Sequence, residues 1–269
     1  MIGAIIGDII GSRFEFKNIR TKTFDLFSGG WRRCAFTDDT VMTIAVAKAL
    51  SKYKKITELE KFKKTLVRTM HQVGVRYPLC GYGQRFSAWL FCGLRKPYNS
   101  YGNGSAMRVS PVAWYANSLE ETEALAKASA EVTHNHPEGI KGARAIASAI
   151  YLARTGKTKE EIRQYIIENY YQIDFTLDKI RPTYRFNETC QGSCPQALQA
   201  FFESTSFEDA IRNAISIGGE SDTIAAMTGS IAEAYYGIPE DIKTKALSYL
   251  DYYLSKELSK ISFYPQREK

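Results

Sequence analysis

Apolar residues recur three and four positions apart along most of this chain, which is the spacing of one face of an α-helix. Four such segments follow a hydroxyl residue with an acid three positions later, a pattern that satisfies free amides at a helix start. They begin at Thr57-x-x-Glu60, Ser118-x-x-Glu121, Thr158-x-x-Glu161 and Ser206-x-x-Asp209. Pro137 suits a first helical position, and Gly156 and Gly218 suit helix ends. The pattern predicts a chain made mostly of helices.

Strict alternation of apolar and polar residues, which indicates a half-buried strand, is scarce. The best case is T-Y-R-F-N-E-T-C, residues 183–190, which fits a small hairpin or a loop. We therefore predict an all-α fold. The length of 269 residues, with 44% hydrophobic and 24% charged residues, is typical of a globular protein. It favours a single domain that spans residues 1–269.

The first eleven residues, M-I-G-A-I-I-G-D-I-I-G, are apolar apart from Asp8. They fall well short of the roughly 20 residues that a membrane span needs, so we expect them inside the fold and predict no membrane partner. Gly3, Gly7 and Gly11 recur every four residues. They predict a smooth stripe on the first helix, against which another backbone packs closely.

Charge and cysteine content add two weaker expectations. The net charge of +7 is compatible with an anionic substrate or partner, but the lysines of residues 52–64 are dispersed as on a solvated helix face, so nucleic acid binding stays open. Five cysteines without C-x-x-C or zinc-type spacing, and no secretory signal, predict reduced thiols and a cytoplasmic protein.

Two stretches far apart in the chain place paired acids and a threonine directly before a helix of small apolar residues. They contribute Thr37, Asp38 and Asp39 in one stretch and Glu220, Asp222 and Thr223 in the other. Helix capping accounts for one side chain per helix, or two. It does not explain doubled acids between flanks that predict burial, because buried like charges are costly unless a cation compensates them. We therefore predict a metal site.

The donors in these stretches are all oxygen atoms, which suit Mg²⁺, Mn²⁺ or Ca²⁺ rather than zinc. Four carboxylates and two threonine hydroxyls fit two divalent cations. Glu15 lies just past the expected end of the first helix, where its carboxylate could reach the same site. A surface glutamate is an equally good interpretation.

Two further segments are candidates for the same cleft. Residues 101–108, Y-G-N-G-S-A-M-R, could cradle phosphate oxygens with their backbone amides, although an ordinary tight turn has the same composition. Residues 133–137, T-H-N-H-P, hold two of the three histidines. Because Pro137 opens a helix there, a loop or capping role is favoured over metal binding.

Taken in order, these segments resemble the ADP-ribosylglycohydrolase family along nearly the whole chain. The resemblance lies in G-D-I-I-G-S-R-F-E-F near the start, T-D-D-T at 37–40, G-N-G-S-A-M-R at 102–108, T-H at 133–134 and G-G-E-S-D-T-I-A-A-M-T-G-S-I-A from 218. It implies a compact orthogonal bundle of many helices with a centre of two Mg²⁺ or Mn²⁺ ions in the middle. The implied activity is hydrolysis of the glycosidic bond between ADP-ribose and an acceptor.

The resemblance also implies roles for single residues. Thr37, Asp38, Asp39, Asp222 and Thr223 match metal ligands, and Glu220 stands where the family usually has aspartate. Asp38 or Glu15 is the expected acid or base. The implied diphosphate and ribose segment contains Asn103, Gly104, Ser105 and Met107, with Arg108 near the pyrophosphate.

The expected substrate is an ADP-ribose conjugate, an ADP-ribosylated protein above all, and the expected state is a monomer. The acceptor linkage stays open among arginine, serine, O-acetyl and nucleic-acid conjugates. Two alternatives also stay open: another Mg²⁺-dependent hydrolase of phosphorylated or nucleotide substrates, and a non-catalytic ADP-ribose binder in which Glu220 weakens the metal site.

Overall fold

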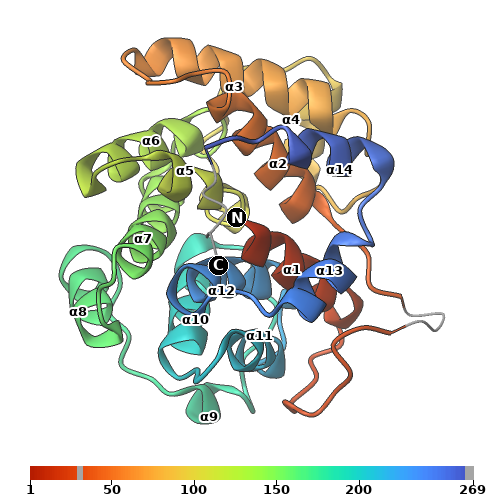
Figure 1. The fold of residues 1–269 in the computed structure, drawn as a ribbon, viewed down its shortest axis with the longest axis vertical. Coiled ribbons are helices and arrows are strands. Elements are labelled where there is room, and N and C mark those ends of the chain that lie inside the picture. The colour runs from red at the N-terminus through yellow and green to blue at the C-terminus, as the bar shows by residue number, and fades with distance from the viewer. Residues whose placement is uncertain (29–32, 264–269) are drawn as a thin grey trace.

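The computed structural model describes residues 1–28 and 33–263, and within them it has fourteen α-helices, two short 3₁₀ helices and no strand (Figure 1). The all-α prediction is confirmed. In chain order the elements are α1 (Ile2–Gly11), η1 (Ser12–Phe14), α2 (Asp38–Leu50), α3 (Leu59–Gly74), α4 (Gln84–Phe91), η2 (Asn103–Ser105), α5 (Ser110–Tyr115), α6 (Leu119–Glu131), α7 (Pro137–Arg154), α8 (Lys159–Asn169), α9 (Leu177–Ile180), α10 (Cys190–Phe202), α11 (Phe207–Ser216), α12 (Ser221–Tyr236), α13 (Glu240–Leu247) and α14 (Tyr252–Ser259).

The predicted helix boundaries are mostly confirmed. The side chains of Ser118, Thr158 and Ser206 cap α6, α8 and α11 by accepting from the amide three residues on. Gly156 and Gly218 follow α7 and α11 with φ of 87° and 75°, a conformation that glycine adopts at little cost.

The predicted cap at Thr57 is wrong. The first turn of α3 closes on Glu58, whose carbonyl accepts from the Phe62 amide at 3.1 Å. Phe62 is the first buried residue of this helix, and the helix starts one residue later than the hydroxyl pattern indicates.

Residues 183–189 form a loop rather than a hairpin. The loop runs beside residues 101–103: the Asn103 amide donates to the Glu188 carbonyl at 2.8 Å, and the Cys190 amide donates to the Tyr101 carbonyl at 2.9 Å. An isolated bridge joins Gly102 and Thr189. Two segments that the sequence kept separate therefore lie side by side.

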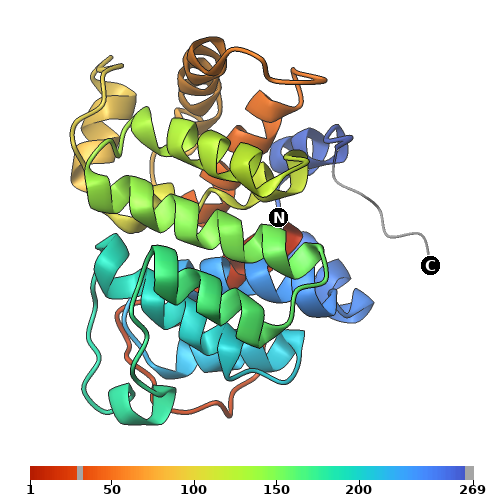
Figure 2. The ribbon, with the colours of Figure 1, turned by 90° about the vertical axis from the view of Figure 1, so that its left-hand side faces the viewer.

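Helices α1 and α12 pack against each other near the middle of the molecule (Figures 1 and 2). A Cβ placed on Gly7 would lie 2.0 Å from the Ala225 carbonyl oxygen, and one on Gly3 would lie 2.1 Å from that of Gly229. Only glycine permits this approach, so the predicted role of the glycine stripe is confirmed. Every residue of α1 is buried, and α12 is buried from Ser221 through Ala234.

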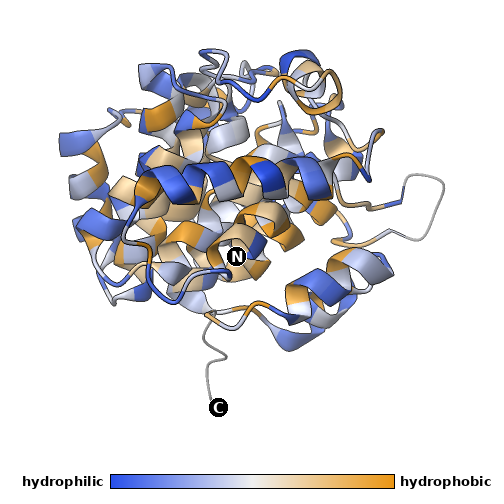
Figure 3. Ribbon diagram, turned by 90° about the horizontal axis from the view of Figure 1, so that it is seen from above, coloured by the Kyte–Doolittle hydropathy of each residue, from blue (hydrophilic) through white to orange (hydrophobic). Residues whose placement is uncertain are grey.

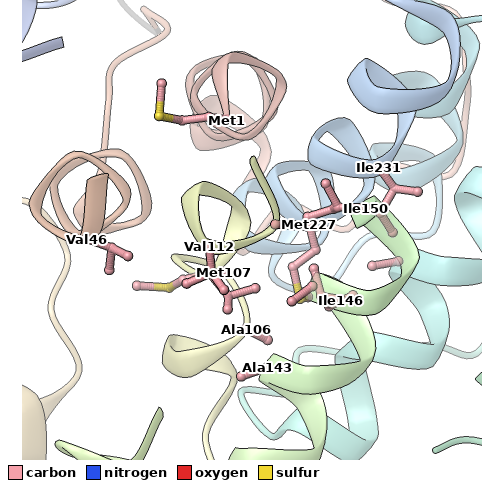
Figure 4. Close-up of a cluster of buried hydrophobic side chains, with 14 of the residues drawn as sticks. Met1, Val46, Ala106, Met107, Val112, Ala143, Ile146, Ile150, Met227 and Ile231 are labelled. Carbon is pink, nitrogen blue, oxygen red and sulfur yellow. The ribbon is translucent and has the colours of Figure 1, made fainter. Parts of the chain in front are cut away.

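The core surrounds this pair. Figure 4 shows side chains such as Val46, Val112, Ile146 and Met227, from α2, α5, α7 and α12, gathered in one cluster. Polar residues occupy the outward faces of the surrounding helices (Figure 3). None of the five cysteines, all of which are described, forms a disulfide. Among the described residues, no helix combines the length and apolarity that crossing a membrane requires.

Candidate metal centre and substrate pocket

Asp8 of α1 fastens the start of α2 to the centre of the fold. Its carboxylate accepts from the Thr37 amide at 2.9 Å, the Thr37 hydroxyl at 2.7 Å and the Thr40 amide at 3.1 Å, and also from the Thr40 hydroxyl. Because α1 packs tightly on α12, this anchoring brings the first turn of α2 beside the first turn of α12.

The two acidic helix starts meet directly. The Thr223 hydroxyl donates to Asp39 Oδ2 at 3.1 Å, which joins α12 to α2. Thr37 caps α2 by accepting from the Asp39 amide, as expected of an ordinary cap, whereas Glu220 makes no side-chain capping bond at the start of α12. Capping therefore explains Thr37 and leaves the paired acids unexplained.

A cluster of acids, which we call the acid cluster, fills this junction. Asp8, Asp39 and Asp222 are at most 4% exposed, and one carboxylate oxygen from each lies within 4.8 Å of the others. Three further carboxylates lie around these three and complete the acid cluster. They belong to Glu15, Asp38 and Glu220, and Glu220 is held by the Asn103 side-chain amide at 2.6 Å.

Burial raises the pKa of every carboxyl group in the acid cluster, and repulsion from neighbouring acids adds to the effect at all of them except Asp8. Burial raises the pKa of Asp8 to about 6 and that of Glu220 to about 7. Burial, followed by repulsion from neighbouring acids, raises the pKa of Asp38, Asp39 and Asp222 well above the usual range, and that of Glu15 as well. The six groups cannot all be ionised at neutral pH without a compensating positive charge.

The residues present fit a divalent cation. All the donor atoms are oxygens, which is the preference of Mg²⁺ and Mn²⁺. Asp39 Oδ1 is buried and has no hydrogen-bond partner among the described residues. Within residues 1–28 and 33–263, no lysine or arginine forms an ion pair with any carboxylate of the acid cluster. A bound cation would satisfy both the free oxygen and the excess charge.

A cavity of about 400 Å³ opens from the acid cluster at Asp38. Asn103, Gly104, Met107 and Arg108 line it, so the structure brings four of the five predicted substrate residues to one pocket. Ser105 is not among the lining residues, and its buried hydroxyl instead donates to the Gly139 carbonyl at 2.7 Å.

A buried chain of polar groups forms one wall of this pocket. Arg108 is 1% exposed and donates through Nη2 to the Thr133 hydroxyl oxygen at 2.8 Å. Burial lowers the pKa of Arg108 to about 10, so it stays protonated at neutral pH. Thr133 Oγ1 lies 2.7 Å from His134 Nδ1.

Burial, then repulsion from Arg108, lowers the pKa of His134 well below its usual range, so the ring is neutral. The Thr133 hydroxyl oxygen already accepts from Arg108. The hydroxyl proton of Thr133 is therefore free to be donated, and His134 Nδ1 is the acceptor within its reach. The ring proton then lies on Nε2, which faces the 102–104 loop: a Cβ on Gly104 would lie 3.1 Å from it. The pocket therefore has one cationic and one neutral donor on this wall.

Sequence reasoning missed Asp8 and His134. Asp8 carried a signal, because a single acid in an otherwise apolar buried helix is costly unless it has a function. His134 stands in the T-H pair at 133–134 that contributes to the family resemblance, but composition and spacing do not separate it from His136. The latter caps α7 by accepting from the Glu138 amide at 3.1 Å, as predicted, whereas His134 enters the pocket.

Glu15 occupies the place predicted for it, directly after α1 and η1, where its carboxylate interacts with that of Asp222. Its segment is tied to the loop before α12. The Asn18 side-chain oxygen accepts from the Gly219 amide at 3.0 Å, and Arg20 donates to the carbonyls of Ile217 and Tyr184.

Comparison with known proteins gives a consistent result. The family model described as ADP-ribosylglycohydrolase matches residues 1–262. The chain is 29% identical to the ADP-ribosylarginine hydrolase Tri1 of Pseudomonas putida (strain GB-1), over 96% of this chain and 76% of the relative.

Two other relatives are 26% identical to this chain. The ADP-ribosylhydrolase ARH3 of Homo sapiens aligns over 89% of this chain and 85% of its own. The ADP-ribosyl-dinitrogen reductase glycohydrolase of Rhodospirillum rubrum aligns over 96% and 90%. A solved structure described as an ADP-ribosylglycohydrolase-related protein complex shares the fold, with a TM-score of 0.67 at 23% identity over 94% of this chain and 97% of that one.

Proposed function

Since the chain belongs to the ADP-ribosylglycohydrolase family, whose members hydrolyse ADP-ribose glycosidic bonds, we propose that it is a divalent-cation-dependent hydrolase that removes ADP-ribose from modified proteins. One observation carries the proposal: a cluster of six carboxylates, without a basic partner in the described residues, lies at the end of a pocket with cationic and neutral donors.

The proposed cation ligands are the predicted ones, and the proposed number is two, Mg²⁺ or Mn²⁺. They are Thr37, Asp38, Asp39, Glu220, Asp222 and Thr223. Asp8 would support them, because its oxygens already hold the amides and hydroxyls of Thr37 and Thr40. When bound, the cations supply Lewis acidity that lowers the pKa of water and anchor points for the hydroxyls of the distal ribose.

The pocket would hold the ADP part of the substrate. Arg108 provides a buried positive charge and His134 a neutral N–H donor, while the backbone of residues 102–104 approaches without side chains at two of its three positions. Such a wall favours a pyrophosphate, because a phosphate oxygen compensates the guanidinium charge in a place that excludes water.

The proposed proton transfers belong to Asp38 and Glu15. Asp38 lines the pocket and also borders the acid cluster, so it lies between the bound sugar and the cations. Glu15 interacts with the carboxyl group of Asp222. A carboxyl group whose pKa is raised by burial can hold a proton for the leaving group or take one from water, as in other glycosidic hydrolyses.

Glu220 departs from the aspartate that the family usually has at this position. Its carboxylate is held by Asn103, so the longer side chain is already tied to the substrate loop. We expect Glu220→Asp to alter metal stoichiometry or turnover, because the shorter side chain loses either this bond or its reach to the cluster. Unchanged values for both would show that the extra methylene has no effect.

The proposed acceptor is a protein side chain. Two relatives are described by their acceptors, arginine for Tri1 and dinitrogen reductase for the Rhodospirillum rubrum enzyme. The net charge of +7 favours nucleic-acid-linked ADP-ribose as a second substrate class. A monomeric, single-domain cytoplasmic protein is part of the same proposal.

The test is release of free ADP-ribose from a panel of arginine-, serine- and nucleic-acid-linked conjugates, with Mn²⁺, Mg²⁺ or EDTA. Asp38→Ala and Asp222→Ala should lower turnover by about 100-fold or more, as loss of acid–base or metal function does. Asp178→Asn, an exposed acid that belongs neither to the acid cluster nor to the pocket lining, is the matched control. Tight ADP-ribose binding without turnover on any conjugate would contradict the proposal.

A further inference from the structure

A strained turn carries Glu15 at the rim of the acid cluster. In residues 14–17 the Lys17 amide donates to the Phe14 carbonyl at 2.9 Å, and Glu15 has φ −48° and ψ 136°, as in a type II turn. Phe16 follows with φ 61°, which this turn requires and which glycine or asparagine adopts most readily. A bulky aromatic residue is strained there. Interactions outside the turn must therefore favour it.

The contact that Phe16 makes outside the turn is with another exposed aromatic ring. Phe16 is 68% exposed and Phe186 is 39% exposed, yet their rings stack with centroids 5.0 Å apart and planes inclined by 23°. Neither ring fills the core. Their contact joins the Glu15 turn to the 183–189 loop, from a distant part of the chain.

The 183–189 loop is itself fixed against the acid cluster. The Tyr184 hydroxyl donates to the Gly192 carbonyl at 2.7 Å, and its ring lies 2.5 Å from a Cβ placed on Gly219, directly before Glu220. Glu188, two residues after Phe186, lies close enough to Glu220 to raise the pKa of that carboxyl. Phe186 thus stands on a loop that is held against the core, whereas in the Glu15 turn the anchors lie at either end, at Phe14 and Asn18, and leave Glu15 and Phe16 between them.

We propose that Phe16 and Phe186 are positioning residues whose stacked rings hold Glu15 against the acid cluster. The inference rests on the proposed function, in which Glu15 transfers a proton. An exposed aromatic pair favours the observed conformation of the turn over others by only about 2- to 10-fold. Loss of either ring therefore releases the turn, and the strain at Phe16 adds to that release when Phe186 is removed.

The expected signature is a separation of kcat from KM. Loss of the pair lowers the share of molecules with Glu15 in place, so kcat should fall by about 2- to 10-fold. The affinity for ADP-ribose stays within about 2-fold of wild type, because Arg108, His134 and the 102–104 loop are untouched.

The test compares Phe186→Ala with Phe186→Tyr and Phe16→Gly, using Mn²⁺-dependent release of ADP-ribose from an ADP-ribosylated protein. Phe186→Tyr keeps the ring and should retain wild-type kcat. Phe186→Ala should lower kcat by about 2- to 10-fold. Phe16→Gly should lower it by less, because glycine relieves the turn strain. Wild-type kcat in Phe186→Ala would overturn the proposal.

Hydrogen exchange measured by mass spectrometry separates this proposal from the proposed function. Exchange at the Lys17 and Gly219 amides should be faster in Phe186→Ala than in wild type and Phe186→Tyr, because the turn and the Asn18 contact both loosen. If wild type releases no ADP-ribose, the proposed function fails, and hydrogen exchange alone then tests the positioning role. Exchange in Phe186→Ala that equals that of wild type overturns this role. Faster exchange with unchanged kcat overturns it as well.

Discussion

Asp39 illustrates, for a single residue, how the site lowers the stability of the cation-free protein. Its Oδ2 atom accepts from Thr223, whereas Oδ1 is buried without a hydrogen-bond partner in the described chain. A buried polar group left unsatisfied costs about 1 to 3 kcal/mol, and more when it is charged. In the cation-free protein, the acid cluster is therefore a source of instability that a bound cation removes.

Asp222→Asn tests this residue-scale account. The substitution keeps the shape of the side chain and removes one buried charge, so at neutral pH we expect the cation-free protein to be more stable by about 1 to 3 kcal/mol. The stabilisation by Mn²⁺ should be lost. Chemical denaturation with EDTA or with Mn²⁺ measures both effects.

Asp178→Asn should change neither value, since Asp178 is exposed. A cation-free Asp222→Asn protein that is less stable than wild type would show that this carboxylate has a structural role instead.

The raised carboxyl pKa values predict how cation-free stability depends on pH. Burial raises the pKa of Asp8 to about 6 and of Glu220 to about 7, above the values near 4 of the unfolded chain. The folded state therefore binds more protons, and stability falls as pH rises through about 4 to 7, by roughly 3 kcal/mol for each group.

Divalent cations should reverse this trend, since they bind the ionised carboxylates. Denaturation curves between pH 5 and 7.5, with EDTA and with Mn²⁺, provide the measurement. Equal slopes in both conditions would mean that the cation does not bind at these groups.

At the scale of elements, three helices position the acid cluster. Helix α1 lies against α12 along its glycines, and Asp8 then holds the first turn of α2. Both α2 and α12 begin at the cluster, so the positive ends of two helix dipoles reduce, without cancelling, the cost of its negative charge.

Gly7→Ala tests the contact between α1 and α12. The new methyl group would lie 2.0 Å from the Ala225 carbonyl oxygen, and backbone cannot move aside as a flexible side chain does. Overpacking of this kind costs about 1 to 3 kcal/mol, and here we expect the upper end. Urea denaturation measures the loss.

Gly83→Ala is the matched control, because a Cβ at Gly83 meets nothing within 4 Å and its φ is not positive. It should cost well under about 1 kcal/mol. A Gly7→Ala protein as stable as Gly83→Ala would mean that α1 can shift on α12 without loss.

At the scale of the whole molecule, charge is unevenly used. The chain has a net charge of +7, yet three buried carboxylates meet near its centre and three more lie around them. The positive charges therefore lie elsewhere, many of them as exposed lysines in ion pairs with neighbouring acids, such as Lys61 with Glu58 and Lys243 with Glu240. Surface pairs of this kind contribute little stability, but the net positive field remains.

This field predicts how substrates respond to salt. For nucleic-acid-linked ADP-ribose, kcat/KM should fall several-fold between 50 and 200 mM salt, on the order expected for a few phosphate contacts. For an arginine-linked peptide without net negative charge, it should change by less than about 2-fold. Steady-state rates for both substrates across the salt series test this, and equal responses would exclude a nucleic-acid surface.

Local chemistry made much of this architecture predictable. Helix starts at Ser118, Thr158 and Ser206 depend on bonds within three residues, so they can be recognised without the fold. The glycine stripe and the paired acids also carry their own signals, because close packing and buried charge restrict residue type wherever they occur. The pattern at Thr57 failed, because α3 begins after Glu58 without any side-chain cap.

The sequence by itself determined the helical class and the family, and it predicts a shared cation site at two acidic helix starts. Only the tertiary structure decided that Asp8 supports them, that His134 rather than His136 faces the pocket, and that Phe16 meets Phe186 beside Glu15. The physical reason is the distance along the chain over which each interaction acts. Capping and periodicity act within a few residues, whereas which distant side chains share a site depends on how α1, α2 and α12 pack, and no local pattern contains that information.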